Sequence, residues 1–236
     1  MGSLLIQSRQ ICLRRSCIGF VIGCVFLICT ASGARAGEPA TIVFALDFPD
    51  SDPAHYSITV NSDGHAKYEC VAKSAPEAEG EPYTSEFDFT PANRARVFEL
   101  AAQAHYFSGK VDSGNHKLAF TGAKKLIYRD GQHTNTAEYN YSELPAVQQL
   151  TAFLQNVAAT LDYGRRIVYY HQYQKLALDD ELKRMEAHAK SNELSELQAV
   201  QPVLQEILED TSVMNVVRAR ARRLIEMGKA ANSNRP

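Results

Sequence analysis

Hydrophobic and polar residues alternate along much of the chain between residues 41 and 141, with the period of two that is typical of β-strands. Short polar segments at residues 62–64 and 130–131 separate neighbouring runs, and each contains a glycine that can supply the positive φ of a tight hairpin. The pattern predicts six or seven antiparallel strands, mostly with one apolar and one polar face. The apolar positions are Ile42, Phe44, Leu46, Phe48, Tyr56, Ile58, Val60, Ala66, Tyr68, Cys70, Phe87, Phe89, Leu118, Phe120, Leu126, Tyr128, Tyr139 and Tyr141.

Two helices are predicted to cover the apolar face of this sheet. Thr90 followed by Pro91 is typical of a helix start, because threonine can cap the helix and proline fits its first turn. A second helix is predicted to begin near residues 142–145. Apolar residues recur in both segments at helical spacing: Val97, Leu100, Ala101, Ala104 and Phe107, then Val147, Leu150, Leu154, Val157 and Leu161. We therefore expect an α+β fold.

The sequence from Gly164 onward is almost entirely helical in character. Residues 167–189 contain no helix breaker, and acidic residues precede basic ones by four positions, which favours a helix. These pairs are Asp179 with Lys183, Asp180 with Arg184, and Glu186 with Lys190. We expect residues 37–163 to form the α+β domain, residues 164–229 a helical extension and residues 230–236 a disordered tail. Residues 72–82 are predicted to be an acidic, flexible insertion.

The first 36 residues have the layout of a secretory signal. They contain four arginines and no acidic residue, an apolar stretch at residues 18–28, and small residues at Ala34 and Ala36. The apolar stretch is about a dozen residues long, shorter than the roughly 20 that a membrane span needs. We expect cleavage near Ala36 and a periplasmic or extracellular protein. The alternative is a retained N-terminal membrane anchor.

Removal of the leader would leave an acidic chain with one cysteine. The chain has 25 basic and 27 acidic residues, and the four leader arginines would be lost, so the net charge becomes −6. Such a charge argues against nucleic acid as a partner. Cys70 would be the only cysteine left, in an alternating segment that predicts a buried, inert thiol. Stability must then come from a hydrophobic core.

Motifs that would indicate a particular chemistry are absent from the sequence. It has no zinc-binding helix, phosphate-binding glycine loop or nucleophile elbow. Thr121 and Lys124 are spaced like a hydroxyl–lysine catalytic pair, but we interpret the segment as a turn with its lysines in water. Asp47, Asp50 and Asp52 are interpreted as a solvated turn. His65, His116 and His133 lie near predicted strand ends, where they could converge into a zinc or catalytic site; scattered placement is the simpler interpretation.

Aromatic and basic residues of the extension are the candidate interaction surface. Tyrosines lie beside arginines near the start of the extension, where they can stack on sugars or peptides. Packing between the sheet domain and the extension is the favoured interpretation, because a long helix that leaves a sheet must bury one side. A second basic stripe follows near residue 220, opposite the apolar residues Val213, Val217, Ala221 and Leu224. It is interpreted as a solvated face, paired with nearby acids upstream. The candidates are Tyr163, Arg165, Arg166, Tyr169, Tyr170, Tyr173, Arg218 and Arg222.

The sequence resembles an uncharacterised family of exported bacterial proteins. The resemblance rests on the run from Tyr56 to Gly64, then on Tyr106-Phe107, Asp112-Ser113 and Tyr139-Asn140-Tyr141 before a helix, and it covers roughly residues 54–163. These are turn and core residues. The resemblance implies export and an α+β layout, and it implies no activity or functional residue.

Together these features predict an exported protein that acts by binding in the cell envelope, without a cofactor or metal. The partner would be an envelope protein, a peptide or a glycan, and contact with a membrane would occur only through an uncleaved leader. Two alternatives stay open. One is a hydrolase whose acids and histidines converge only in three dimensions; the other is a structural envelope protein that self-associates through its helical extension.

Overall fold

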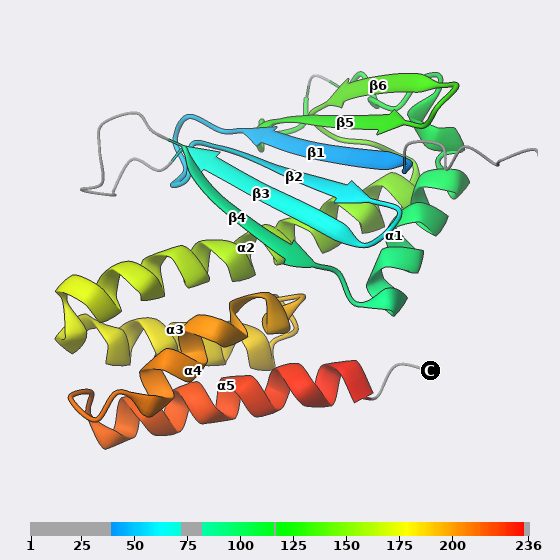
Figure 1. Ribbon diagram of the computed structural model, residues 1–236. Helices are drawn as coiled ribbons and strands as arrows, with labels where there is room; N and C mark the ends of the chain where they lie inside the picture. Colours follow the sequence, from blue (N-terminus) through cyan, green and yellow to red (C-terminus); the bar gives the residue numbers. More distant parts are fainter. Residues whose placement is uncertain (1–38, 72–81, 116, 234–236) are drawn as a thin grey trace, which may run out of the picture. The chain divides into compact units, whose positions relative to one another are not determined.

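Six antiparallel strands form one sheet in the order β4-β3-β2-β1-β5-β6 (Figure 1). The computed structural model describes residues 39–71, 82–115 and 117–233. The predicted leader and most of the predicted acidic insertion lie outside these residues. The strands are β1 (Thr41–Asp47), β2 (His55–Asn61), β3 (His65–Val71), β4 (Tyr83–Asp88), β5 (Ala123–Arg129) and β6 (Thr134–Tyr139).

The alternation of the sequence sets the register of the strands. Phe44 in β1 lies opposite Ile58 in β2 and Leu126 in β5, and Ile58 lies opposite Tyr68 in β3. All four side chains are fully buried, so they form one row of the core across four strands. Residues between them, such as Ser57 and Lys67, point to the opposite face and are partly exposed. A slip of one residue would turn the buried row to that face, which is why the pattern fixes the register.

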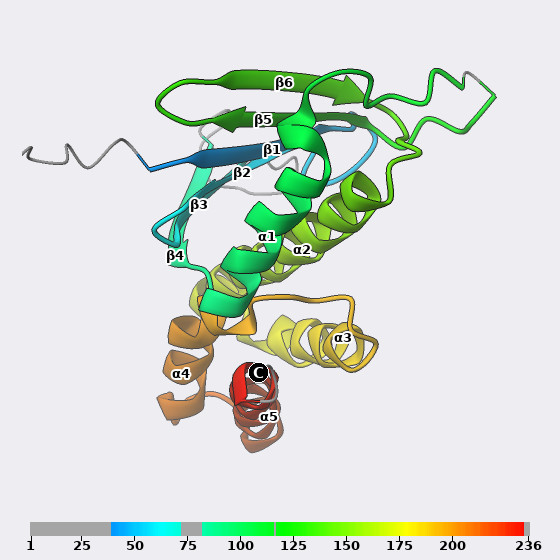
Figure 2. The same ribbon diagram turned by 90° about the vertical axis from the view of Figure 1, so that its right-hand side faces the viewer.

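Two helices cover the buried face of the sheet, as expected (Figure 2). Helix α1 (Pro91–Gln103) follows β4, and α2 (Pro145–Tyr173) follows β6. The predicted apolar stripe of α2, from Val147 to Leu161, is buried along its length. A short 3-10 turn, η1 (His105–Phe107), ends the first helical segment and buries Phe107. The α+β architecture predicted from the sequence is therefore present.

The C-terminal half of α2 and five shorter segments form the helical extension. They are η2 (Lys175–Ala177), α3 (Leu178–Lys190), η3 (Leu197–Val200), α4 (Gln201–Glu209) and α5 (Asn215–Ser233). Helix α2 passes through residue 164 without interruption, so one helix carries both the cover of the sheet and the start of the extension (Figure 1). The predicted apolar stripe of α5, from Val213 to Leu224, is buried.

Several predictions about individual segments were wrong. Residues 167–189 are not one helix: the chain turns at Gln174 and folds back as α3, which buries Leu182 and Met185. Residues 118–120 form no strand, and the side chains of Leu118 and Phe120 are 40% and 57% exposed. The short apolar alternation there had too few residues to distinguish a strand from a loop.

One of the two predicted hairpin glycines was confirmed, and the predicted start of the C-terminal tail was wrong. Gly64 has the positive φ expected of the β2–β3 hairpin, whereas Gly131 does not; there the Asp130 carboxylate accepts the backbone N–H groups of Gln132 and His133. Helix α5 continues to Ser233, so it includes four residues that were assigned to the disordered tail.

Salt bridges join α3 to α5 and differ from those predicted. Glu186 pairs with Lys190 as expected, but it also accepts two hydrogen bonds from Arg223, at 3.0 and 2.9 Å. Asp179 pairs with Arg220 of α5 at 2.8 Å instead of with Lys183. Arg220 and Arg223 of α5 are therefore paired with acids of α3, not with the acids upstream in α4.

Glu186 makes the bundle sensitive to acid. Hydrogen bonds from Arg223, together with Lys190, lower the pKa of this carboxyl from 4.5 to about 2. Because the pKa is depressed in the folded state, the stabilisation is complete above pH 4.5 and is lost as the pH falls toward 2. We expect Glu186→Gln to lower the free energy of unfolding by about 2 kcal/mol at pH 7.

The measurement is urea unfolding at pH 7 and at pH 2.5. The difference between wild type and Glu186→Gln should shrink at the lower pH. Glu206→Gln is the matched control, because Glu206 is an exposed residue of the neighbouring helix α4. A Glu186→Gln variant as stable as wild type at pH 7 would contradict the role of this carboxylate.

Candidate functional site

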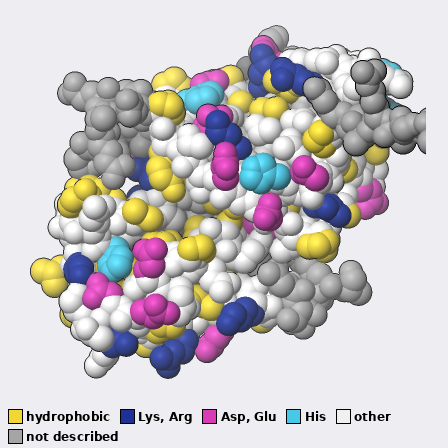
Figure 3. Space-filling model, in the orientation of Figure 1, with side chains coloured by type: hydrophobic (Ala, Val, Ile, Leu, Met, Phe, Trp, Pro, Cys, Tyr) yellow, Lys and Arg dark blue, Asp and Glu magenta, His cyan; other side chains and the backbone are white. Residues whose placement is uncertain are grey.

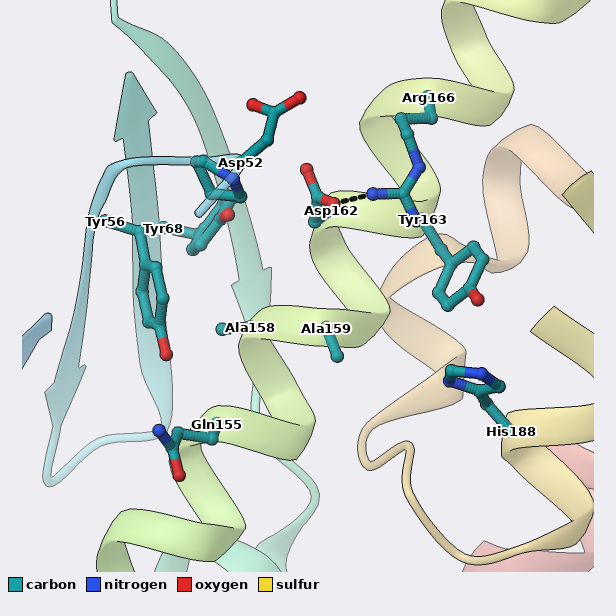
Figure 4. A pocket seen from close by; sticks show the side chains of 11 residues that line it. Asp52, Tyr56, Tyr68, Gln155, Ala158, Ala159, Asp162, Tyr163, Arg166 and His188 are labelled. Carbon is teal, nitrogen blue, oxygen red and sulfur yellow. Dashed lines mark hydrogen bonds and ion pairs between the residues drawn. The ribbon is translucent and has the colours of Figure 1, made fainter. Parts of the chain in front are cut away.

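A cavity of about 290 Å³ lies between the sheet and α2. Figure 4 shows Tyr56 and Tyr68 on the strand side, and Gln155, Asp162 and Arg166 on α2. Asp52 and Pro53, from the loop between β1 and β2, and His188 of α3 complete its outline. The cavity therefore combines side chains from the sheet, the covering helix and the extension.

The two tyrosines contribute hydroxyl groups on the strand side of the cavity. Tyr68 is fully buried, and its hydroxyl is the one buried side-chain oxygen or nitrogen without a hydrogen-bond partner among the residues that the structure describes. Burial raises the pKa of Tyr68 most, and the thiol of Cys70, on the same face of β3, raises it further through a close contact. That contact does not meet the geometry of a hydrogen bond, so the hydroxyl counts as unpaired. An unpaired buried hydroxyl costs folding free energy.

Burial moves the pKa values of these tyrosines further from neutrality. Desolvation raises the pKa of both Tyr56 and Tyr68 far above the usual value of 10. Gln155 hydrogen-bonds the hydroxyl of Tyr56 and partly offsets the effect. Both groups are consequently neutral phenols near pH 7 and can donate a hydrogen bond to a bound molecule.

A network of ion pairs borders the cavity on α2. Asp162, which is buried, accepts hydrogen bonds from Nε and Nη2 of Arg165 at 3.0 and 2.8 Å, and it also pairs with Arg166. The Nε of Arg166 donates to Glu181 of α3 at 2.7 Å. Its guanidinium also lies 4.6 Å from the ring centre of Tyr163. These contacts fix Arg166 at the rim.

The structure divides the predicted tyrosine and arginine cluster into two groups. Tyr163, which is buried, and Arg166, which is partly buried, line the cavity, whereas the buried Arg165 pairs with Asp162 beside it. Tyr169, Tyr170 and Tyr173 lie further along α2, with ring centres of Tyr169 5.7 and 5.2 Å from those of Tyr170 and Tyr173. Tyr173 is 61% exposed.

The predicted basic stripe on α5 is not a single surface. The Nε of Arg218 donates to the backbone oxygen of Leu208 at 2.8 Å, so this residue ties α5 to α4. Arg222 is exposed. On the face of the molecule in Figure 3, basic and acidic side chains are interspersed and do not form one basic patch.

The prediction that Lys124 faces water was wrong. Its side chain is buried, and Nζ donates to Thr121 Oγ1 at 2.9 Å and to the backbone oxygens of Thr121, Gly122 and Asn140 at 3.0–3.2 Å. Burial lowers the pKa of its ammonium group. The predicted turn between two strands is not present: Thr121 and Gly122 belong to the loop before β5, and Lys124 lies in β5 itself. Its neighbour Lys125 pairs with Glu138 on the open face.

A second cavity of about 300 Å³ adjoins Lys124 and shares Gln155 with the first. Its polar groups are already paired, since Lys124 has four acceptors and the hydroxyls of Tyr139 and Thr151 lie 2.6 Å apart. The first cavity differs because it contains a buried group that is unpaired.

Of the histidines considered for a zinc or catalytic site, His65 and His133 are not among the residues that line the cavity. His65 pairs with Glu86 and Asp88 on exposed strand ends, and His133 pairs with Asp130 in the β5–β6 hairpin. His116 is outside the described residues. Within the described ranges, no group of three or more His, Cys, Asp or Glu residues is arranged to hold a metal ion. Asp47 pairs with His55, whereas Asp52 lines the cavity.

The residues that carry the resemblance have structural roles here. Tyr56, Ile58, Val60 and Phe107 are core residues. Asp112 accepts the backbone N–H of Asn140 at 3.1 Å and so joins its loop to the end of β6.

Comparison with known proteins does not assign the chain to a family. No protein-family model, curated protein or solved structure matches it. The resemblance to exported bacterial proteins therefore stays a prediction. In the part of the chain that the structure describes, no helix is long and apolar enough to cross a membrane.

Sequence reasoning missed the cavity itself. Tyr56 and Tyr68 were assigned to the core because they occupy alternating apolar positions, which is correct for their rings but not informative about their hydroxyls. Gln155 and Asp162 gave a weak signal, since both are polar residues next to the predicted apolar stripe of α2. Only the packing of α2 on β2 and β3 brings the four together.

Proposed function

We propose that this chain is an exported protein, periplasmic or extracellular after cleavage near Ala36, that acts in the cell envelope by binding a ligand in the cavity between β2, β3 and α2. The observation that carries the proposal is the buried, unpaired hydroxyl of Tyr68 in the wall of that cavity. Burying this hydroxyl without a partner costs folding free energy. A ligand in the cavity that accepts its hydrogen bond would recover that cost on binding.

The protonation states favour binding over proton transfer. A tyrosine hydroxyl is already protonated near neutral pH at its ordinary pKa of about 10, and burial raises the pKa of Tyr56 and Tyr68 further. Neutral phenols at such pKa values are poor general bases. The hydrolase alternative would instead need titratable groups with pKa values shifted toward neutrality in the cavity.

Tyr68→Phe separates a binding role from a structural one. If the hydroxyl serves a ligand, its removal relieves an unpaired group, so the free energy of unfolding of the ligand-free protein should stay equal or rise by up to about 1 kcal/mol. The measurement is urea unfolding of extensively dialysed protein. Tyr128→Phe is the control: Tyr128 is also buried in the sheet, but its hydroxyl bonds Asp130 at 3.2 Å, so this variant should be less stable than wild type. A comparable loss of stability in Tyr68→Phe would contradict the proposal.

Self-association through the helical extension is a second candidate. It is favoured by exposed apolar residues near the turn between α2 and α3 and the start of α5, namely Val168, Tyr173, Leu176, Met214 and Val216. Deletion of residues 164–236 would cut α2, so a point substitution is the better test. Leu176 is 84% exposed, and Leu176→Glu should leave folding intact. Sedimentation that shows wild-type oligomers and monomeric Leu176→Glu would support this candidate; monomers in both would remove it.

A further inference from the structure

The size and chemistry of the cavity restrict the ligand that it can take. At about 290 Å³ it has room for roughly ten water-sized groups. That is the size of one small metabolite or one unit of a polymer, at the lower end of ligand pockets. A larger ligand would have to leave most of its surface outside.

Asp162 and Arg166, which line the cavity, are already paired within the protein. The charge of Asp162 is shared between Arg166 and the neighbouring Arg165. Asp52 is a second carboxylate of the lining, at the loop side, and Arg166 is the one arginine among the lining residues. Arg166 bonds both Asp162 and Glu181, which leaves it poorly placed to neutralise an anion. An uncharged ligand therefore fits better than an anion.

The lining also favours a ligand with several polar groups. The Tyr68 hydroxyl can donate to an oxygen of the ligand, and the amide of Gln155 can both donate and accept. Figure 4 shows the ring of Tyr56 extending along the cavity wall toward Gln155. Flat aromatic surface beside amide and hydroxyl groups suits a molecule whose ring has apolar faces and polar edges.

We propose that the cavity takes a single neutral sugar unit, either free or at the end of a glycan, with one ligand oxygen accepting a hydrogen bond from Tyr68. This inference rests on the proposed binding function and specifies its ligand class. A sugar ring has the required size, lacks charge, and carries hydroxyl groups for both Tyr68 and Gln155. An amino acid zwitterion of similar size would bring a carboxylate to a site whose one lining arginine is already paired with Asp162 and Glu181.

Ligand-detected NMR can test this inference. Saturation transfer from the mature chain would be recorded to D-glucose, to N-acetyl-D-glucosamine and to its β-1,4-linked trimer, with alanine and inorganic phosphate as charged comparison compounds. We expect transfer to at least one of the sugars and none to alanine or phosphate. Signals from the trimer that are confined to a terminal unit would indicate a glycan end, whereas a preference for monosaccharides would indicate a free sugar.

Two variants make the result specific. Tyr68→Phe should weaken sugar binding about fivefold or more, the loss expected for one neutral hydrogen bond, while Tyr128→Phe should bind like wild type. Absence of sugar signals, or sugar binding that is the same in wild type and Tyr68→Phe, would overturn the sugar assignment. Binding of alanine or phosphate that depends on Tyr68 would also overturn it, but would leave the proposed binding function in place. A destabilised Tyr68→Phe with no binding to any probe would overturn both.

Discussion

Glu196→Ala should lower the free energy of unfolding by about 3 kcal/mol, although the residue lies in a short connection between α3 and η3. Glu196 is buried, and its carboxylate lies at the start of α1. It accepts the backbone N–H of Thr90 at 3.1 Å, the Thr90 hydroxyl at 2.9 Å and the side-chain amide of Asn93. The substitution would leave these donors unpaired at a helix end that makes no side-chain cap of its own.

This contact ties the extension to the sheet domain. A negative charge at a helix N-terminus is also favoured by the helix dipole. The measurement is urea unfolding followed by circular dichroism, with Glu193→Ala as the control, because Glu193 is a nearby exposed glutamate. Glu193→Ala should change stability by less than about 0.5 kcal/mol. Equal stabilities of the two variants would show that Glu196 does not hold the two parts together.

Gly164→Ala should destabilise the protein by about 2 kcal/mol, even though alanine is the better helix former. A Cβ at residue 164 would lie 2.6 Å from Cγ1 of Val200, closer than van der Waals contact permits. Both residues are buried, so neither can move into solvent. The helix-propensity gain of about 1 kcal/mol is smaller than the cost of this overlap.

The double variant Gly164→Ala with Val200→Ala provides the matched test. Val200→Ala alone should lower stability because it creates a cavity, but it removes the atom that meets the new Cβ. The two substitutions should therefore cost less together than the sum of their separate costs. Additive costs, or a stabilised Gly164→Ala, would show that α2 and η3 are not in close contact at this point.

Local patterns predicted the elements well where they were long and periodic. The alternation of β1 and β2 and the stripe of α2 predicted their buried residues, because a period of two or of 3.6 leaves little choice of face. Pro91 and Pro145 predicted where α1 and α2 begin. Such signals are local, and the fold class follows from their order along the chain.

Features that depend on contacts between distant segments could not be predicted in this way. Gly164 looked like the boundary of a domain, but it is the point where η3 packs on α2. Glu196 looked like one more acidic residue of the extension, and its partners lie about a hundred residues earlier. Lys124 looked solvated, because sequence gives no sign of the backbone oxygens that surround it.

The candidate site shows the same limit. Tyr56, Tyr68, Gln155 and Asp162 come from three elements, and each is ordinary in its local sequence. The predicted tyrosine and arginine cluster led to Tyr163 and Arg166 at the rim of the cavity, but for a reason that the sequence did not reveal: their packing on Asp162 and α3. The sequence therefore predicted two residues that line the cavity, but not the buried hydroxyl of Tyr68 in its wall.

Native mass spectrometry of the protein recovered gently from its own host tests the central claim most directly. Export with ligand binding predicts a chain that begins at Gly37, found in the envelope or medium, with a non-covalent small molecule that is present on wild type and lost from Tyr68→Phe. A chain that keeps Met1 and stays in the cytoplasm would contradict export. A bare mass for both wild type and Tyr68→Phe would contradict the binding role of the cavity.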